Sequence, residues 1–222
     1  MSNYLLVGEM HGTKECPLIF LKIINTYKIK RVALELPQHY QHEIDQYVKG
    51  KITLDDLSLF KNKEQMHDGR VSHSIKKLIE KLKKQKIKIF FAEPSFAKNG
   101  NERDYLMAKN LMNIKGKVAF LCGNIHASKK EIRLDKKSNF YNYYNYYSKG
   151  IIKTCGYFLA KKDTISIRIH AINGGTFYNN GIKNYRKDEM TLKSKHKLPS
   201  IIKSSDKAFD YLYLINKFSY SK

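Results

Sequence analysis

The sequence has little of what marks disulfide-rich, secreted or membrane-spanning proteins. Its three cysteines are an odd number without CxxC spacing, which is typical of reduced thiols rather than of a disulfide framework. No apolar run approaches the ~20 residues that a membrane-spanning helix requires, so no membrane partner is expected. The first residues, MSNYLLVGEMHG, contain neither a basic leader nor a cleavage site. We therefore expect a cytoplasmic protein.

Arginine is also scarce, although the chain is strongly basic. Only six of its 42 basic residues are arginine, and the formal net charge is +22. Proteins that read nucleic acids depend on the arginine fork, which binds phosphate and guanine through two hydrogen bonds. A solvated lysine-rich surface is therefore favoured, and nucleic acid is the less favoured partner. Residues 129–222 carry 20 basic and 7 acidic side chains, so any polyanion would bind there.

What the sequence does have is the composition of a globular protein, with 42% hydrophobic and 28% charged residues among 222. That length fits one domain, which buries roughly 70% of the surface of its unfolded chain. We expect residues 1–222 to form a single α/β domain. Within it, residues 1–128 are a motif-bearing core and residues 129–222 a basic, tyrosine-rich C-terminal part.

The core alternates short apolar runs with helical patterns. Continuous apolar strands separated by helices are typical of a mainly parallel sheet covered on both faces, so the fold class is α/β. The clearest helix has Ile75, Leu78, Ile79 and Leu82 on one face. Strands are predicted at 3–7, 31–36, 88–92 and 118–122, and helices at 17–27, 38–48, 54–60, 71–84 and 102–113.

The C-terminal part has a different pattern. Two alternating stretches predict antiparallel strands, and an Asn-Gly-Gly sequence after them predicts a turn. A run of aromatic and polar residues, FYNYYNYY, predicts a loop or insertion. In chain order, we expect a loop at 140–147, strands at 151–160 and 164–172, a turn at 173–175, a basic loop at 183–205 and a helix at 208–218.

Two of the core strands are followed by the same motif, Gly-x-x-His. The first strand leads into Gly8 and His11, and the fourth into Gly123 and His126. In an open α/β sheet, ligands bind just beyond the carboxyl ends of the strands. Both imidazoles should therefore reach the functional edge, where glycine lets the backbone turn.

Charged residues follow the other two strands. Glu35 ends the second strand and Glu93 the third, where a buried carboxylate is costly unless it is paired or used. Asp68 and Arg70 precede one helix, and Arg103 opens the next. A structural interpretation of each stays open: Glu35 could pair with an arginine that locks the sheet, and Asp68 could cap a helix.

In order, the motifs GEMHGT, LELP, DGR, RDYLMAKN and GNIHAS resemble the haem-uptake/Tiki superfamily, which joins erythromycin esterase-like, ChaN-like and TraB/Tiki proteins. The resemblance covers about residues 3–128. It implies a cleft lined by paired histidines, glutamates and a helical arginine, namely Glu9, His11, Glu35, Arg103 and His126. It also implies one of three chemistries: water attack assisted by histidine, metal-dependent proteolysis, or haem (heme) binding.

Our leading hypothesis is a hydrolase that attacks an ester, lactone or amide bond of a small-molecule or peptide substrate. His11 is the general base, oriented by Glu9 or Glu35, while Arg103 and His126 stabilise the oxyanion. The absence of GxSxG favours direct attack by water over a covalent intermediate. The residues expected to bind substrate are Asp68, Arg70 and Asn110.

Three alternatives stay open beside this hypothesis. In a metal-dependent version, His11, His126, Glu9 and Glu35 would hold Mn, Zn, Co or Fe, and the ion would lower the pKa of bound water. A second alternative is a haem- or metal-binding protein without turnover. A third is a polyanion-binding protein that uses the C-terminal lysines. The sequence alone names neither the substrate nor the oligomeric state.

Overall fold

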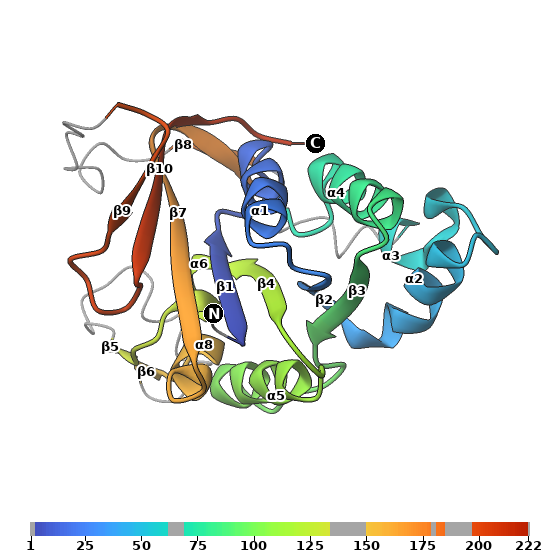
Figure 1. The fold of residues 1–222 in the computed structure, drawn as a ribbon, viewed down its shortest axis with the longest axis horizontal. Coiled ribbons are helices and arrows are strands. Elements are labelled where there is room, and N and C mark those ends of the chain that lie inside the picture. The colour runs from blue at the N-terminus through green and yellow to red at the C-terminus, as the bar shows by residue number, and fades with distance from the viewer. Residues whose placement is uncertain (1–2, 62–68, 134–149, 179–180, 185–196, 222) are drawn as a thin grey trace.

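A computed structural model describes residues 3–61, 69–133, 150–178, 181–184 and 197–221, with side chains described outside 172–196. Figure 1 shows a central sheet between two layers of helices. The α/β fold predicted from the sequence is confirmed.

The core strands are β1 (Tyr4–Glu9), β2 (Arg31–Pro37), β3 (Lys88–Glu93) and β4 (Val118–Gly123). The main helices are α1 (Glu15–Thr26), α2 (Gln41–Val48), α4 (His73–Lys84) and α5 (Gly100–Met112). Short helical turns complete the set: η1 (Gln38–Tyr40), η2 (Leu54–Asp56), α3 (Ser58–Lys61) and α6 (Asn124–Ala127).

The sheet is mostly parallel. Its order is β3-β2-β4-β1-β7-β10-β9, with β7 (Thr164–Tyr178), β9 (Ser200–Lys203) and β10 (Tyr211–Phe218), while β8 (Gly181–Asn184) pairs with β7. All pairs from β3 through to β10 are parallel, and β9 and β8 add antiparallel partners. The four core strands therefore end at one edge of the sheet, where the predicted site residues follow them.

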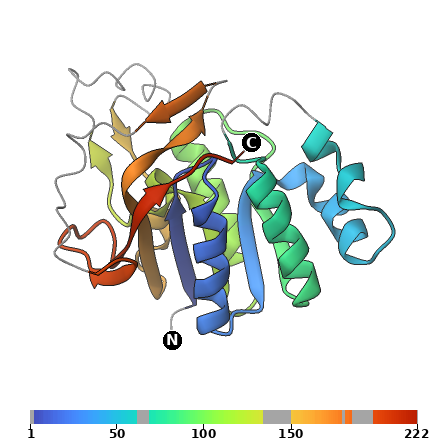
Figure 2. The same cartoon turned by 90° about the horizontal axis from the view of Figure 1, so that it is seen from above.

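Alternate residues of each strand pack into different layers. Leu5 and Val7 of β1 face α1 and α4, which lie side by side over the strands in Figure 2. Leu6, between them, faces the opposite layer, which contains α5 and α8 (Cys155–Leu159). Because both faces of the central strands are buried, their sequences are continuously apolar, as expected for a parallel sheet.

In the C-terminal part, the structure differs from three predictions. Residues 208–218 were expected to be a helix, but Tyr211–Phe218 forms β10 between β7 and β9, where both neighbours supply backbone partners. The stretch 151–160 is not a strand throughout: Ile151–Ile152 forms β6, which pairs with β5 (Ile132–Arg133), and the Thr154 hydroxyl then caps α8. The segment 164–172 is a strand, but it runs parallel to its neighbours.

Two smaller predictions concern the same region. Residues 173–175 were expected to form a turn, but they lie inside β7, which continues to Tyr178. Part of the expected basic loop, 183–205, forms β8 and β9 instead. The aromatic stretch 140–147 lies outside the described residues. Because β7 and β10 join the same sheet as β1–β4, the C-terminal part completes the sheet that the core begins.

A short C-terminal segment, residues 219–221, ties two loops near the site together. The Ser221 N–H donates to the Gly12 carbonyl at 2.7 Å, and the Gly12 N–H donates to the Gly69 carbonyl at 3.1 Å. The Ser221 hydroxyl, which is buried, accepts from the Ser74 N–H at 3.0 Å and bonds the Ser74 hydroxyl at 2.7 Å. The loop after β1, the loop before α4 and segment 219–221 thus form one hydrogen-bonded unit.

The outermost strand at one end of the sheet, β3, receives a side chain where another strand would pair. The Gln41 amide nitrogen donates to the Ile89 carbonyl at 3.1 Å, and its oxygen accepts the Phe91 N–H at 2.7 Å. The side chain thereby imitates the two hydrogen bonds of a peptide group. Among the described residues, no helix is long and apolar enough to cross a membrane.

Candidate active site

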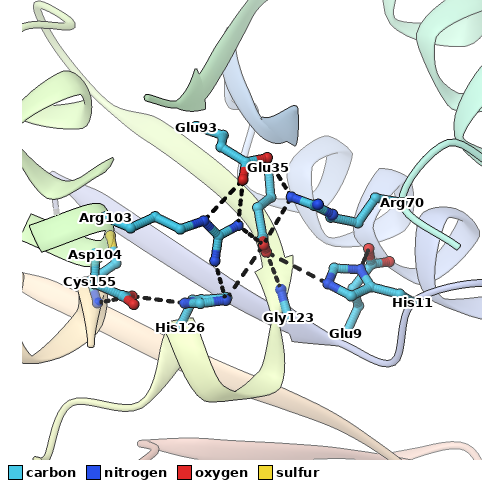
Figure 3. Close-up of polar contacts among 10 residues, drawn as sticks. All are labelled: Glu9, His11, Glu35, Arg70, Glu93, Arg103, Asp104, Gly123, His126 and Cys155. Atoms are coloured by element: carbon cyan, nitrogen blue, oxygen red, sulfur yellow. Dashed lines mark hydrogen bonds and ion pairs between the residues drawn. The ribbon is translucent and has the colours of Figure 1, made fainter. Parts of the chain in front are cut away.

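The two Gly-x-x-His motifs lie next to each other at one edge of the sheet. Strands β1 and β4 are parallel neighbours, with Glu9 beside Gly123. A Cβ atom on Gly123 would lie 2.9 Å from His11 Nε2 and 3.4 Å from His126 Cδ2. Only glycine leaves room for both imidazoles, because a methyl group at this point would displace His11. Figure 3 shows the two rings on either side of Gly123.

Glu35, at the end of β2, lies at the centre of the site. Its side chain is buried, and its Oε2 accepts the Gly123 N–H at 2.7 Å. Its Oε1 accepts from Arg103 Nη2 at 2.6 Å. The Nε2 atom of His11 lies 3.6 Å from Oε2, and that of His126 lies 3.4 Å from Oε1. One carboxylate therefore contacts both histidines.

The pKa of Glu35 reflects this arrangement. Burial alone would raise it, because a charged carboxylate loses its hydration. The positive charge around it, from His126 when protonated, from Arg103, from His11 when protonated and from Arg70, instead holds the pKa well below its ordinary value of 4.5. Glu35 is therefore a permanent carboxylate at neutral pH.

Two guanidinium groups join Glu35 to a second carboxylate, Glu93, at the end of β3. Arg103 donates from Nε to Glu93 Oε1 at 2.9 Å, and its Nη2 lies 2.8 Å from the same oxygen. Arg70 donates from Nη1 to the other Glu93 oxygen, and this nitrogen also lies 3.7 Å from Glu35 Oε1. Each arginine thus contacts both glutamates, which fixes the position of the charges (Figure 3).

Each histidine has its own carboxylate on the side away from Glu35. His11 Nδ1 lies 2.9 Å from Glu9 Oε1, and His126 Nδ1 lies 2.7 Å from Asp104 Oδ1. Asp104 is fully buried and follows Arg103 in α5, a helix whose first turn is capped by the Asn99 side chain. The site therefore holds two histidine–carboxylate pairs. We refer to Glu9, His11, Glu35, Arg70, Glu93, Arg103, Asp104 and His126 as the Glu35 cluster.

Sequence reasoning did not identify Asp104 as a site residue. The available signal was the Arg103-Asp104 doublet after a helix cap, but successive helical residues point about 100° apart. Only the orientation of α5 shows that Arg103 reaches Glu35 while Asp104 reaches His126. Glu93 was considered from the sequence but was not assigned to the site, and it holds both arginines.

Of the residues predicted to bind substrate, Arg70 lies in the Glu35 cluster, whereas Asp68 lies outside the described residues. Asn110 donates to the Gln38 side chain at 3.2 Å and to the Ala92 carbonyl at 3.0 Å. These bonds link α5 to η1 and to β3. Cys122 is a buried core thiol, and burial raises its pKa.

A small cavity opens beside His11. Its volume is about 10 Å³, close to the minimum for one water molecule. The His11 side chain is 22% exposed, against 9% for His126, so His11 is the more accessible imidazole. The lining residues are Glu9, His11, Leu34, Glu35, Leu36, Arg70, Ile75 and Leu121.

The charges in the cluster do not form a set of metal ligands. Among the described residues, which include all four proposed ligands, no group of three or more His, Cys, Asp or Glu side chains is placed to hold a metal ion. The Glu35 oxygens already accept from Arg103 and from the Gly123 N–H. Two guanidinium groups within 4 Å of Glu35 would repel a divalent cation. A haem also greatly exceeds the cavity beside His11 in size.

The structure thus combines a mostly parallel α/β sheet with paired histidines and arginine-bridged carboxylates at one edge of that sheet. The sequence matches no protein-family model and no curated protein. Solved structures are similar: an erythromycin esterase variant, EreC, in its open conformation has a TM-score of 0.69 and 8% identity, over 100% of this chain and 92% of that chain. A Bacillus cereus protein has a TM-score of 0.63 and 14% identity, over 99% and 90% of the two chains.

ChaN of Campylobacter jejuni, described for its cofacial heme binding, has a TM-score of 0.55 and 14% identity, over 100% of this chain and 88% of that chain. At such identities the likeness shows the fold alone. The chain therefore has the fold shared by ChaN and erythromycin esterase, as the motifs suggested.

Proposed function

We propose that the protein is a hydrolase in which His11 activates water for direct attack on an ester, lactone or amide bond. The observation that carries this proposal is the position of His11. Its Nδ1 is held by Glu9, its Nε2 faces Glu35, and its ring borders the small cavity together with Arg70. An imidazole that is held on one nitrogen and whose ring borders a cavity has the arrangement of a general base.

The proton balance follows from this arrangement. With its Nδ1–H donated to Glu9, neutral His11 presents a lone pair at Nε2. Nε2 removes a proton from water while the oxygen bonds to the carbonyl carbon. When the bond between that carbon and the leaving oxygen or nitrogen breaks, the proton passes to the leaving atom. Glu9 and Glu35 stabilise the imidazolium formed in between. A positioned base of this kind contributes about 10²–10⁴-fold in rate.

The arginines provide the positive charge that a tetrahedral intermediate needs. Arg70 lines the cavity, so it is the nearer donor to a developing oxyanion, and Arg103 reinforces it from behind. This modifies the hypothesis from sequence, which assigned that role to Arg103 and His126. Because Glu93 holds both guanidinium groups in place, they need little reorganisation during the reaction.

The proposal is tested with chromogenic p-nitrophenyl esters, a lactone panel and the variant His11→Ala. The matched control is His42→Ala, because His42 is exposed on α2 and bonds Gln46. We expect His11→Ala to lose about 10²–10⁴-fold in kcat and His42→Ala to keep wild-type activity. Wild-type hydrolysis by the His11 variant would refute the assignment of the base.

A hemin titration serves as a control that tests haem binding at the same site. The support for it is the fold shared with ChaN, and no described residue of the Glu35 cluster favours it over hydrolysis. Adding hemin to the wild type and to His11→Ala would separate specific ligation from adsorption. A Soret band that requires His11 would favour haem as the ligand of this site.

A further inference from the structure

The second histidine–carboxylate pair, Asp104 and His126, differs from the first in its surroundings. Asp104 is completely buried, and its Oδ1 accepts the Cys155 N–H at 2.7 Å as well as bonding His126 Nδ1 at 2.7 Å. Its Oδ2 is buried and has no hydrogen-bond partner among the residues described. A buried carboxylate is costly, so these two donors are what hold it in place.

The proton on His126 can be placed from its other nitrogen. Arg103 Nη1 lies 3.0 Å from His126 Nε2. A guanidinium group has donors only, so Nε2 must be the acceptor and cannot carry a hydrogen. The single imidazole proton is then on Nδ1, where Asp104 Oδ1 accepts it (Figure 3).

We propose that Asp104 is a positioning residue, which holds His126 as the neutral tautomer protonated on Nδ1 so that its Nε2 lone pair orients Arg103. The inference rests on the proposed function, because it assigns different tasks to the two histidines. His126 is a fixed acceptor for Arg103, and His11 is the base. With Nη1 held by His126, Arg103 directs its remaining N–H groups at Glu35 and Glu93.

The contacts that hold Asp104, His126 and Arg103 together involve three helices of the fold. Asp104 and Arg103 are on α5, His126 is on α6, and the Cys155 N–H at the start of α8 fixes the Asp104 carboxylate from behind. The alternative is an imidazolium whose Nε2–H points to Glu35 Oε1, but that distance is 3.4 Å. It would also place two donors, Nε2–H and Arg103 Nη1, 3.0 Å apart.

The first test uses the wild-type protein and does not depend on activity. Long-range ¹H–¹⁵N correlation spectra of ¹⁵N-histidine-labelled protein at neutral pH distinguish the two neutral tautomers and the imidazolium. The variant His126→Gln identifies the signals by their loss. We expect His126 to have a protonated Nδ1 and an unprotonated Nε2. An Nε2–H tautomer or an imidazolium would overturn the proposal, whether or not a substrate is known.

The second test uses Asp104→Asn, which keeps the shape and removes the charge. We expect His126 to lose its single tautomer and kcat on the best ester to fall by up to about 10²–10³-fold, the cost of losing an oriented oxyanion donor, with KM nearly unchanged. The control is Asp210→Asn, since the Asp210 carboxylate also accepts a backbone N–H, from Ser166, and pairs with Lys129. The control should change neither property.

The outcomes separate this inference from the proposed function. If Asp104→Asn keeps both the tautomer and kcat, Asp104 is not the positioning residue, even if His11 proves essential. If no ester is hydrolysed, the spectra still decide the tautomer. If Asp104→Asn does not fold, the wild-type spectrum alone decides, because the proposal requires the Nδ1–H form.

Discussion

Glu35→Gln is the substitution that most directly tests the cluster around Glu35. It keeps the size of the side chain but replaces a buried carboxylate with a neutral amide. Both arginines lose one of their two carboxylate partners, because Arg103 and Arg70 then keep only Glu93. The amide oxygen can still accept the Gly123 N–H, but the amide nitrogen then replaces the oxygen that accepts from Arg103, so the substitution removes the charge and that hydrogen bond together.

The loss of stability expected for Glu35→Gln can be estimated from the burial of the Glu35 carboxylate. Removing one partner of a buried ion pair costs about 3–5 kcal/mol, because the other charge stays desolvated. Arg103 and Arg70 retain Glu93, so we expect the lower end, about 3 kcal/mol, in the free energy of unfolding. A domain has about 5–15 kcal/mol in total, so the variant should fold with clearly reduced stability.

The assay is urea unfolding followed by circular dichroism, in which the midpoint should fall while the slope m stays unchanged. The matched control is Glu131→Gln, which removes the carboxylate from an ion pair with Arg133, whose side chain is 78% exposed. Surface pairs contribute about 0–1 kcal/mol, so this midpoint should barely move. Equal midpoints for the two variants would refute the view that the cluster is a buried, mutually dependent network.

The difference in stability between the wild type and Glu35→Gln should depend on pH. The pKa of Glu35 is well below 4.5 in the folded protein and near 4.5 once it unfolds, so the unfolded chain binds the extra proton more readily. The stability that Glu35 contributes is complete above pH 4.5 and is lost as the pH falls towards its folded pKa. The wild type should therefore approach Glu35→Gln in acid. A difference that grows on acidification would contradict this sign.

Three further predictions concern single features. Gly123→Ala should lower kcat by at least about tenfold while folding normally by circular dichroism, because its Cβ would lie 2.9 Å from His11 Nε2 and displace the base. Unchanged kcat would show that the ring moves freely. Ser221→Ala should lower the free energy of unfolding by about 1 kcal/mol in a urea titration, because the half-buried Ser74 N–H loses its acceptor. The three buried cysteines should resist Ellman's reagent until urea unfolds the chain, because burial raises their pKa values; rapid labelling of the native protein would contradict this.

The first half of the fold could be predicted because its signals are local. Strands β1–β4 are continuously apolar and end in glycine, glutamate or proline, and the α4 face repeats with helical spacing. The later strands depend on distant partners. Residues 208–218 contain apolar side chains compatible with either structure, and only pairing with β7 and β9 makes β10 a strand. Such pairing cannot be read from a short window of sequence.

In the candidate site, too, some features could be predicted from local sequence and others depend on distant partners. The repeated motif predicted that His11 and His126 reach one edge, and the parallel pairing of β1 with β4 brings both to Glu35. The role of Asp104 depends on the angle of α5 against the sheet. The accessibility of Arg70 depends on a loop held by Gly12 and segment 219–221. Neither property belongs to a residue and its immediate neighbours.

The amide of Gln41 has a consequence for the protein in concentrated solution. An uncovered edge strand is a template on which the strand of another molecule can assemble. At the β3 edge, the Ile89 carbonyl and the Phe91 N–H are already bonded to one side chain of the same molecule. An incoming chain would have to displace Gln41 before gaining any hydrogen bond there. A single uncharged side chain thus protects the β3 end of the sheet against strand-to-strand aggregation.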